Sequence, residues 1–238
     1  MKFWLILLFT VGCSSSPLLP IHSPIRSELV NNSSASIHFV PAHRVRGAQS
    51  DAAASLDKTP YQAKSYTYRF GYESRGLPWS SHFLHIGPDS PLDLGLKIQP
   101  YGFDGSSFKV LLQTHVGMVL SPTKVDAKDI PGDPKKVRKG LITGWNWSAV
   151  FALGYRFSPL WISSLGVRRS AFSTHHRFSD GIDDEWTING QQMAYFFDQG
   201  LDFSSWRVDI SLFYGGIGLA DQDPDLKFGS ALTLSFAW

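Results

Sequence analysis

Large apolar side chains alternate with small or polar ones along most of the chain after Tyr61. In the run from Ser65 to Tyr72, for example, Tyr66, Tyr68 and Phe70 alternate with residues of the other kind. A period of two is typical of a β-strand with one apolar face. Eight segments carry this pattern, at residues 65–72, 92–98, 108–118, 145–157, 161–168, 186–198, 206–214 and 227–238.

The last of these segments ends on an aromatic residue. Its apolar positions fall on one strand face and follow a glycine, and the residues are Gly229, Leu232, Leu234, Phe236 and Trp238. This arrangement resembles the C-terminal assembly signal of bacterial outer-membrane β-barrel proteins. The resemblance implies a Gram-negative source and recognition of these residues by the barrel-assembly machinery.

The connections between the segments also favour a barrel. Long connections at residues 74–91, 121–140, 173–185 and 215–225 alternate with short ones. Outer-membrane barrels combine an even number of antiparallel strands with short periplasmic turns and long extracellular loops. We therefore predict an all-β fold, an eight-stranded antiparallel transmembrane β-barrel. A ten-stranded barrel stays open as an alternative, because residues 79–86 also fit a strand.

Periodicity alone leaves open which face points outward, and a soluble eight-stranded barrel would show the same pattern. The alternate face carries few charges, and charged residues make up 18% of the chain, below the roughly 25% typical of soluble domains. Aromatic residues also gather at the predicted periplasmic strand ends, where membrane barrels carry a girdle. They are Tyr155, Phe157, Trp161, Phe197, Phe203, Trp206, Phe236 and Trp238. These features favour the outer membrane, and the net charge of +2 does not favour a nucleic-acid partner.

The N-terminus has the pattern of a secretion signal. Residues 1–12 hold a basic start and a short apolar run that leads to Cys13, the only cysteine. A small residue before such a cysteine resembles the lipobox of bacterial lipoproteins, which implies lipidation of Cys13; an ordinary cleaved signal is the alternative. Residues 13–60 are predicted to form a lipidated, mostly disordered periplasmic tether. The barrel is predicted to cover residues 61–238.

The face opposite the apolar one would line the lumen. Its members are Arg69, Glu73, Asp93, Lys97, Lys109, Gln113, His115, Asn146, Arg156, Arg168, Gln192, Arg207 and Asp209. Charges of both signs in a narrow interior have to pair, because an unpaired buried charge is costly. An eight-stranded barrel has room only for side chains. The sequence therefore favours a lumen closed by ion pairs over a conducting pore.

One set of residues has the types needed for nucleophilic hydrolysis. The third long connection contains His176, Ser179 and Asp184. Enzymes of this kind use a histidine close to a serine and an acid. The segment partly resembles outer-membrane lipid A deacylases over about ten residues, which implies an acyl hydrolase acting on lipid A or phospholipid. The alternative is a polar surface loop with two ordinary histidines.

A basic cluster ends the second long connection, at Lys135, Lys136, Arg138 and Lys139. Its position just above the expected outer interface would suit the phosphates of lipopolysaccharide. Asp221, Asp223 and Asp225 lack the glycine and terminal glutamate of an EF-hand loop, so we expect no metal site. No cofactor motif occurs either.

The sequence thus predicts a monomeric, lipid-anchored, non-enzymatic barrel protein of the outer membrane. Its extracellular loops would serve a structural or surface-interaction role, with membrane lipid and lipopolysaccharide as partners. An acyl hydrolase and a narrow transport pore are the two alternatives.

Overall fold

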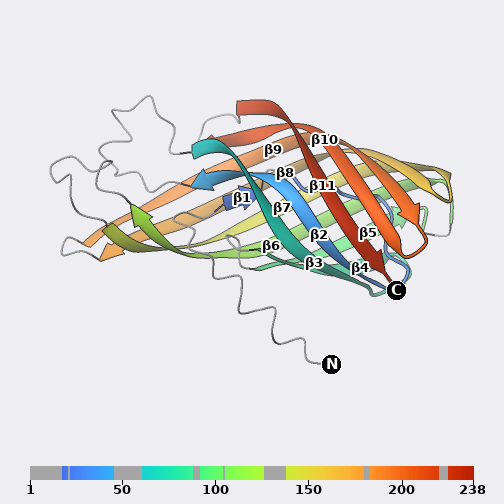
Figure 1. Cartoon of the computed structure of the whole chain (residues 1–238), viewed down its shortest axis with the longest axis horizontal. Coiled ribbons are helices and arrows are strands. Elements are labelled where there is room, and N and C mark those ends of the chain that lie inside the picture. Colours follow the sequence, from blue (N-terminus) through green and yellow to red (C-terminus); the bar gives the residue numbers. More distant parts are fainter. Residues whose placement is uncertain are drawn as a thin grey trace.

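The chain forms a closed antiparallel β-barrel. The computed structural model describes residues 18–20, 22–45, 61–87, 92–103, 105–125, 138–179, 183–219 and 225–238, and these ranges hold eleven strands and no helix. The strands are β1 (Leu18–Pro20), β2 (Ser33–Val45), β3 (Tyr61–Arg75), β4 (Ser80–Ile86), β5 (Leu92–Tyr101), β6 (Phe108–Val125), β7 (Arg138–Ser158), β8 (Trp161–Ser179), β9 (Asp183–Phe203), β10 (Trp206–Leu219) and β11 (Asp225–Ala237). Strands β2 to β11 close the barrel, and the short β1 pairs with β2 alone (Figure 1). The all-β antiparallel barrel is confirmed, with ten strands rather than eight.

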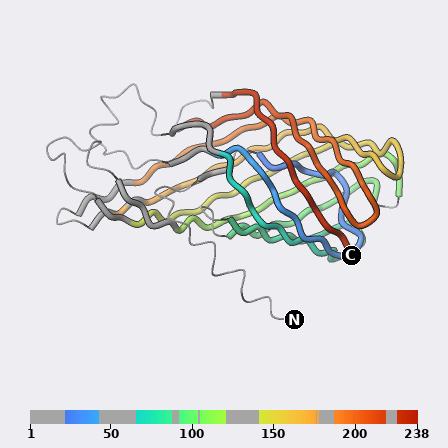
Figure 2. Tube along the Cα trace, viewed as in Figure 1, coloured from blue at the N-terminus to red at the C-terminus, as the bar shows by residue number. Residues whose placement is uncertain are grey.

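The first additional strand is β2, which lies between β11 and β3. Phe39 pairs with Leu232 of β11 on one side and with Tyr68 of β3 on the other. The first and last strands of the barrel, β2 and β11, therefore close the sheet (Figure 2). The prediction that residues 13–60 form a disordered tether was therefore wrong for residues 33–45. Ile37 and Phe39 point outward and are exposed, whereas His38 and Val40 point inward and are buried.

A proline hid this strand in the sequence. Pro41 interrupts the apolar pattern of β2 and cannot donate a ladder hydrogen bond. It lies between the stretch of β2 that pairs with β11, which ends at Phe39, and the stretch that pairs with β1, which begins at Ala42. The proline is tolerated because it occupies the point where β2 changes partners.

The second additional strand is β4, which lies inside the expected first long loop. It pairs with β3 and β5, and it follows a tight turn in which Ser80 N donates to Leu77 O. The expected loop at residues 173–185 is also mostly strand, because β8 runs to Ser179 and β9 begins at Asp183. We call the barrel end with the connections 76–79, 102–107, 159–160 and 204–205 the turn end, and the opposite one the loop end.

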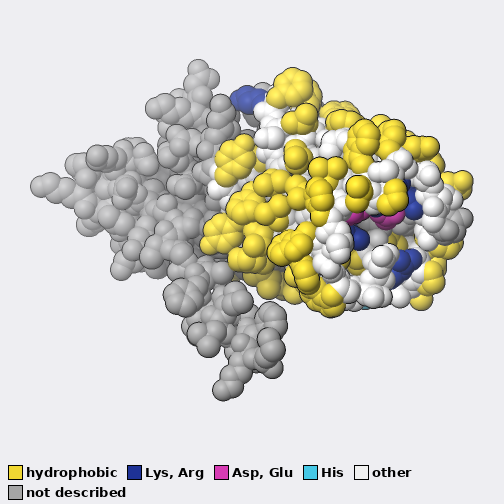
Figure 3. All heavy atoms as spheres, turned by 45° about the vertical axis from the view of Figure 1, so that its right-hand side comes forward, with side chains coloured by type: hydrophobic (Ala, Val, Ile, Leu, Met, Phe, Trp, Pro, Cys, Tyr) yellow, Lys and Arg dark blue, Asp and Glu magenta, His cyan; other side chains and the backbone are white. Residues whose placement is uncertain are grey.

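Bulky apolar side chains cover the outside of the barrel. Exposed positions on its strands include Tyr66, Leu94, Val116, Trp145, Leu165, Ile210 and Leu212. Figure 3 shows hydrophobic side chains around the barrel wall, with charged side chains grouped inside the ring at the turn end. The alternate positions are buried and mostly polar, among them Arg69, Asp93, Lys109, Gln113, His115 and Asp209. The predicted orientation, apolar outward and polar inward, is confirmed.

Several inward phenylalanines lie over glycines of the neighbouring strand. Phe213 pairs with Gly229 and Phe83 pairs with Gly95. A Cβ atom at Gly229 would lie 2.4 Å from Phe213 Cζ, and one at Gly95 would lie 2.1 Å from Phe83 Cζ. Gly229 of the predicted assembly signal thus has a packing role. Because it has no side chain, the Phe213 ring can lie directly against the backbone of the inner wall.

We expect Gly229→Ala to destabilise the barrel by about 1–3 kcal/mol, because the added methyl group overlaps the buried Phe213 ring. Urea unfolding of the purified protein, followed by tryptophan fluorescence, would measure the change. Ser230→Ala at the next position is the matched control, since Ser230 is exposed. Equal midpoints for the two variants would contradict the packing role.

Candidate functional site in the barrel lumen

Residues 22–32 run through the inside of the barrel, and we call them the luminal segment. The segment follows β1, which lies beside the loop-end half of β2, with Leu18 opposite Arg44. It reaches the turn end, where Ser33 begins β2 and exchanges backbone hydrogen bonds with Trp238. His22 and Ser27 are fully buried. The expected periplasmic tether is therefore wrong here too, since this part of it fills the lumen and comes from the loop end.

One network of ion pairs holds the luminal segment to the wall, and Arg156 links its two parts through Asp202. Arg26 donates from Nη1 to Asp202 Oδ1 at 2.5 Å and from Nη2 to Asp209 Oδ1 at 2.8 Å. Glu28 pairs with Arg156 and lies 3.4 Å from Lys109 Nζ. The segment thus contributes one cation and one anion, each to a wall region of opposite charge.

Wall side chains also satisfy the backbone of the luminal segment. Ile25 N donates to Asp198 Oδ2 at 2.5 Å, and Leu29 N donates to Gln99 Oε1 at 3.2 Å. An extended segment without a strand partner needs such acceptors, because a buried N–H group left unpaired is costly. Side chains of the barrel wall therefore accept the hydrogen bonds that a neighbouring strand would otherwise accept.

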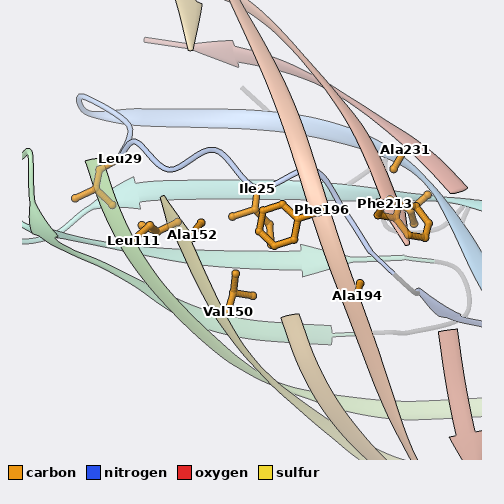
Figure 4. Packing of buried hydrophobic residues seen from close by; sticks show 10 residues of the cluster. Ile25, Leu29, Leu111, Val150, Ala152, Ala194, Phe196, Phe213 and Ala231 are labelled. Carbon is orange, nitrogen blue, oxygen red and sulfur yellow. The ribbon is translucent and has the colours of Figure 1, made fainter. Parts of the chain in front are cut away.

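Apolar contacts complete the packing. Ile25 and Leu29 join a buried cluster whose other members come from the inner wall: Val40, Leu111, Val150, Ala152, Ala194, Phe196, Phe213 and Ala231. Figure 4 shows Ile25 next to Phe196, and the His22 ring stacks on Phe196 with centroids 4.5 Å apart. The lumen is thus a small mixed core, in which the luminal segment supplies both charge and apolar surface.

A second polar cluster lies on the wall away from the luminal segment. Arg69 pairs with Asp93, and Lys97 Nζ lies 2.5 Å from Glu73 Oε2. A cavity of about 760 Å³, partly open to solvent, separates this cluster from the luminal segment. The prediction that luminal charges pair with one another is confirmed for these residues.

His115, Ser148 and Asp93 have the residue types of a hydrolytic triad. Ser148 Oγ lies 2.8 Å from His115 Nδ1, and Asp93 Oδ2 lies 4.0 Å from His115 Nε2. Ser148 is fully buried, however, and lines neither the cavity beside the luminal segment nor a smaller one beside Gln192. A nucleophile needs space for the substrate carbonyl beside it. This geometry supports a structural hydrogen bond rather than hydrolysis.

The predicted hydrolase residues lie on the β8–β9 hairpin. In its register His176 pairs with Trp186, Phe178 with Asp184, and Ser179 with Asp183. The side chains of His176, Ser179 and Asp184 lie outside the described part of the structure, so their catalytic role stays a prediction. The same holds for the basic cluster, since Lys135 and Lys136 and the side chains of Arg138 and Lys139 are not described, and for Cys13.

The predicted assembly signal is on the outer face of β11. Leu234, Phe236 and Trp238 are exposed there, and the Phe236 ring lies 5.2 Å from that of Trp206. Phe157 stacks on Trp161 at 4.5 Å in the same turn-end region. The exposed aromatics at the turn end therefore form contacting pairs rather than isolated residues.

Sequence analysis missed the luminal segment and two of its partners, Asp198 and Asp202. Asp198 is the last residue of the predicted strand at residues 186–198, and Asp202 lies beyond it. Arg26 and Glu28, two opposite charges in a stretch rich in serine and proline, are the one signal that could have indicated them. Among the described residues, no group of three or more His, Cys, Asp or Glu is placed to hold a metal ion.

Comparison with known proteins adds no relative. No protein-family model matches the chain, and no curated protein matches it.

Arg26→Met should loosen the luminal segment, because it removes the ion pair with Asp202 and the one ion pair that the buried Asp209 forms among the described residues. Removing one partner of a buried ion pair costs about 3–5 kcal/mol. A cysteine placed at the buried Ser23, with Cys13 replaced by serine, reports this loosening by its labelling rate with a maleimide.

We expect Arg26→Met to raise the labelling rate at least roughly tenfold, well within that energy. Arg169→Met, which removes the same charge from an exposed position, should leave the rate unchanged. Equal rates in both variants would mean that Arg26 does not hold the segment.

Proposed function

We propose that the protein is a non-enzymatic, integral barrel of the bacterial outer membrane, whose lumen is closed at rest by the luminal segment. The observation that supports this proposal most is the apolar composition of the outward face. A ring of large apolar side chains surrounds a closed sheet, while Arg26, Arg69, Asp93, Lys109 and Asp209 are buried inside it.

A hydrocarbon environment explains both features. Soluble monomers rarely expose continuous apolar patches larger than a few hundred Å². In lipid the same surface is favourable, and a closed barrel pairs its backbone groups within the sheet. The contacting aromatics at the turn end, such as Phe157 and Trp161, suit the girdle at a membrane interface.

In this proposal the loop end faces outward and the turn end faces the periplasm. The loops would contact lipopolysaccharide or another surface, with Lys135, Lys136, Arg138 and Lys139 as the phosphate-binding cluster. Cys13 would carry the lipid anchor, and the β11 residues ending in Trp238 would be recognised by the assembly machinery.

A second candidate is a gated pore. The luminal segment is held by ion pairs and side-chain hydrogen bonds, and β-barrel walls remain closed without it, since β2 pairs with both β3 and β11. A cavity of about 760 Å³ already lies between the segment and the wall. Movement of the segment would join this space into a channel.

Membrane insertion is tested by extraction of cell envelopes. We expect the protein to stay in the membrane pellet after alkaline and urea washes and to dissolve only with detergent. We also expect the folded barrel to migrate faster than the heated chain on a gel. Release by the alkaline wash alone would refute the membrane assignment.

Closure by the luminal segment is tested by single-channel recording. Wild-type protein in a planar bilayer should be silent, because the segment fills the lumen. A variant with both Arg26→Met and Glu28→Gln should show openings, since both charged attachments are lost. Arg169→Met serves as the control and should be silent. Wild-type conductance equal to that of the double variant would contradict a closing role for the segment.

A further inference from the structure

One buried arginine has no carboxylate partner. The fully or nearly buried basic residues in the described chain are Arg26, Arg69, Lys109 and Arg168. The first three each form an ion pair, with Asp209, Asp93 and Glu28 in turn. Arg168, only 7% exposed, donates from Nε to Ser170 Oγ at 3.1 Å and forms no ion pair with any described residue.

The nearest acid cannot neutralise it. Asp93 lines the same small cavity, but its Oδ2 is held by Arg69 and its Oδ1 accepts from Asn146 Nδ2 at 3.4 Å. Arg168 is therefore left without an ion-pair partner among the described residues. Such a charge in a closed interior is costly unless a counter-charge joins it.

Hydrogen-bond donors without acceptors surround this charge. Gln192 Nε2 is buried and has no partner among the described residues, and Gln192 lies opposite Ser170 in the β8–β9 register. Ser170 accepts from Arg168, which leaves its hydroxyl proton free to donate. Arg168, Ser170 and Gln192 line one cavity of about 290 Å³.

We propose that this cavity binds a small oxyanion, such as inorganic phosphate, sulfate or the carboxylate of a short organic acid. The planar guanidinium of Arg168 would bind two oxygens side by side, and Ser170 and Gln192 would donate to the others. The cavity is small, since only nine residues line it, so the ligand is compact.

Water alone is a poorer occupant. Water molecules could accept from Gln192 and Ser170, but they would leave the charge of Arg168 without an ion-pair partner. A cation is excluded by the same charge. The proposal goes beyond the closed-barrel function and does not depend on membrane insertion, because it concerns only the interior.

The test measures thermal unfolding of the purified barrel in increasing sodium phosphate or sodium sulfate. Sodium chloride at equal ionic strength corrects for general screening. A ligand that binds only the folded state raises the unfolding temperature with its concentration. Phosphate and sulfate also stabilise folded proteins by exclusion from their surface. We therefore expect a larger rise in wild-type protein than in Arg168→Met, which keeps only this general part.

Arg169→Met is the matched control, because the neighbouring arginine is exposed on the outer face, and it should keep the full rise. Without oxyanion, Arg168→Met should be at least as stable as wild type, since it removes a buried charge that has no ion-pair partner among the described residues. If that variant does not fold, Gln192→Leu replaces it, and this variant should need a higher oxyanion concentration for the same rise.

Two results would overturn the proposal. One is an unfolding temperature of the wild type that follows ionic strength alone. The other is a rise in Arg168→Met or in Gln192→Leu equal to that of the wild type. A failed membrane extraction would leave this measurement unaffected, so the two proposals fail separately.

Discussion

The arrangement of the interior depends on the matching of buried charge. The wall strands β9 and β10 present Asp198, Asp202 and Asp209 to the lumen, and Arg26 lies between two of them. Asp202 also pairs with Arg156 and Arg207 of the wall, whereas Arg26 is the ion-pair partner of Asp209 among the described residues, and a buried acid without a partner is costly. The position of Arg26 therefore fixes where the luminal segment lies, and Glu28 fixes its far part through Arg156.

The number of strands determines whether the lumen is wide enough to hold the luminal segment. A barrel widens with each added strand, and eight strands leave room only for side chains. Strands β2 and β4 bring the count to ten, which creates space that inward side chains of the wall do not fill. The luminal segment occupies part of that space with Ile25 and Leu29, and the remainder is the polar cavity beside Arg168.

The sequence predicted the features that repeat along the chain and missed those that do not. Strict alternation, as in Tyr66 to Tyr72, reports both the strand and the face that points outward. β2 was hidden by Pro41, whereas β4 confirms the alternative that residues 79–86 form a strand. The luminal segment has no periodicity, because it is surrounded by wall on all sides rather than on one. Its partners, such as Asp209, lie up to 183 residues away, a separation at which local patterns carry no information.

Closure by β2 sets the order in which the molecule can assemble. The final seam joins Phe39 to Leu232, so a complete cylinder exists only after the last strand has been synthesised and has met the first. The luminal segment is continuous with β2 at the turn end, and its preceding residues leave by the loop end. Protein chains rarely thread through structure that is already closed. The sheet must therefore curl around residues 22–32 while still open, and joining of the seam is also the step that encloses them.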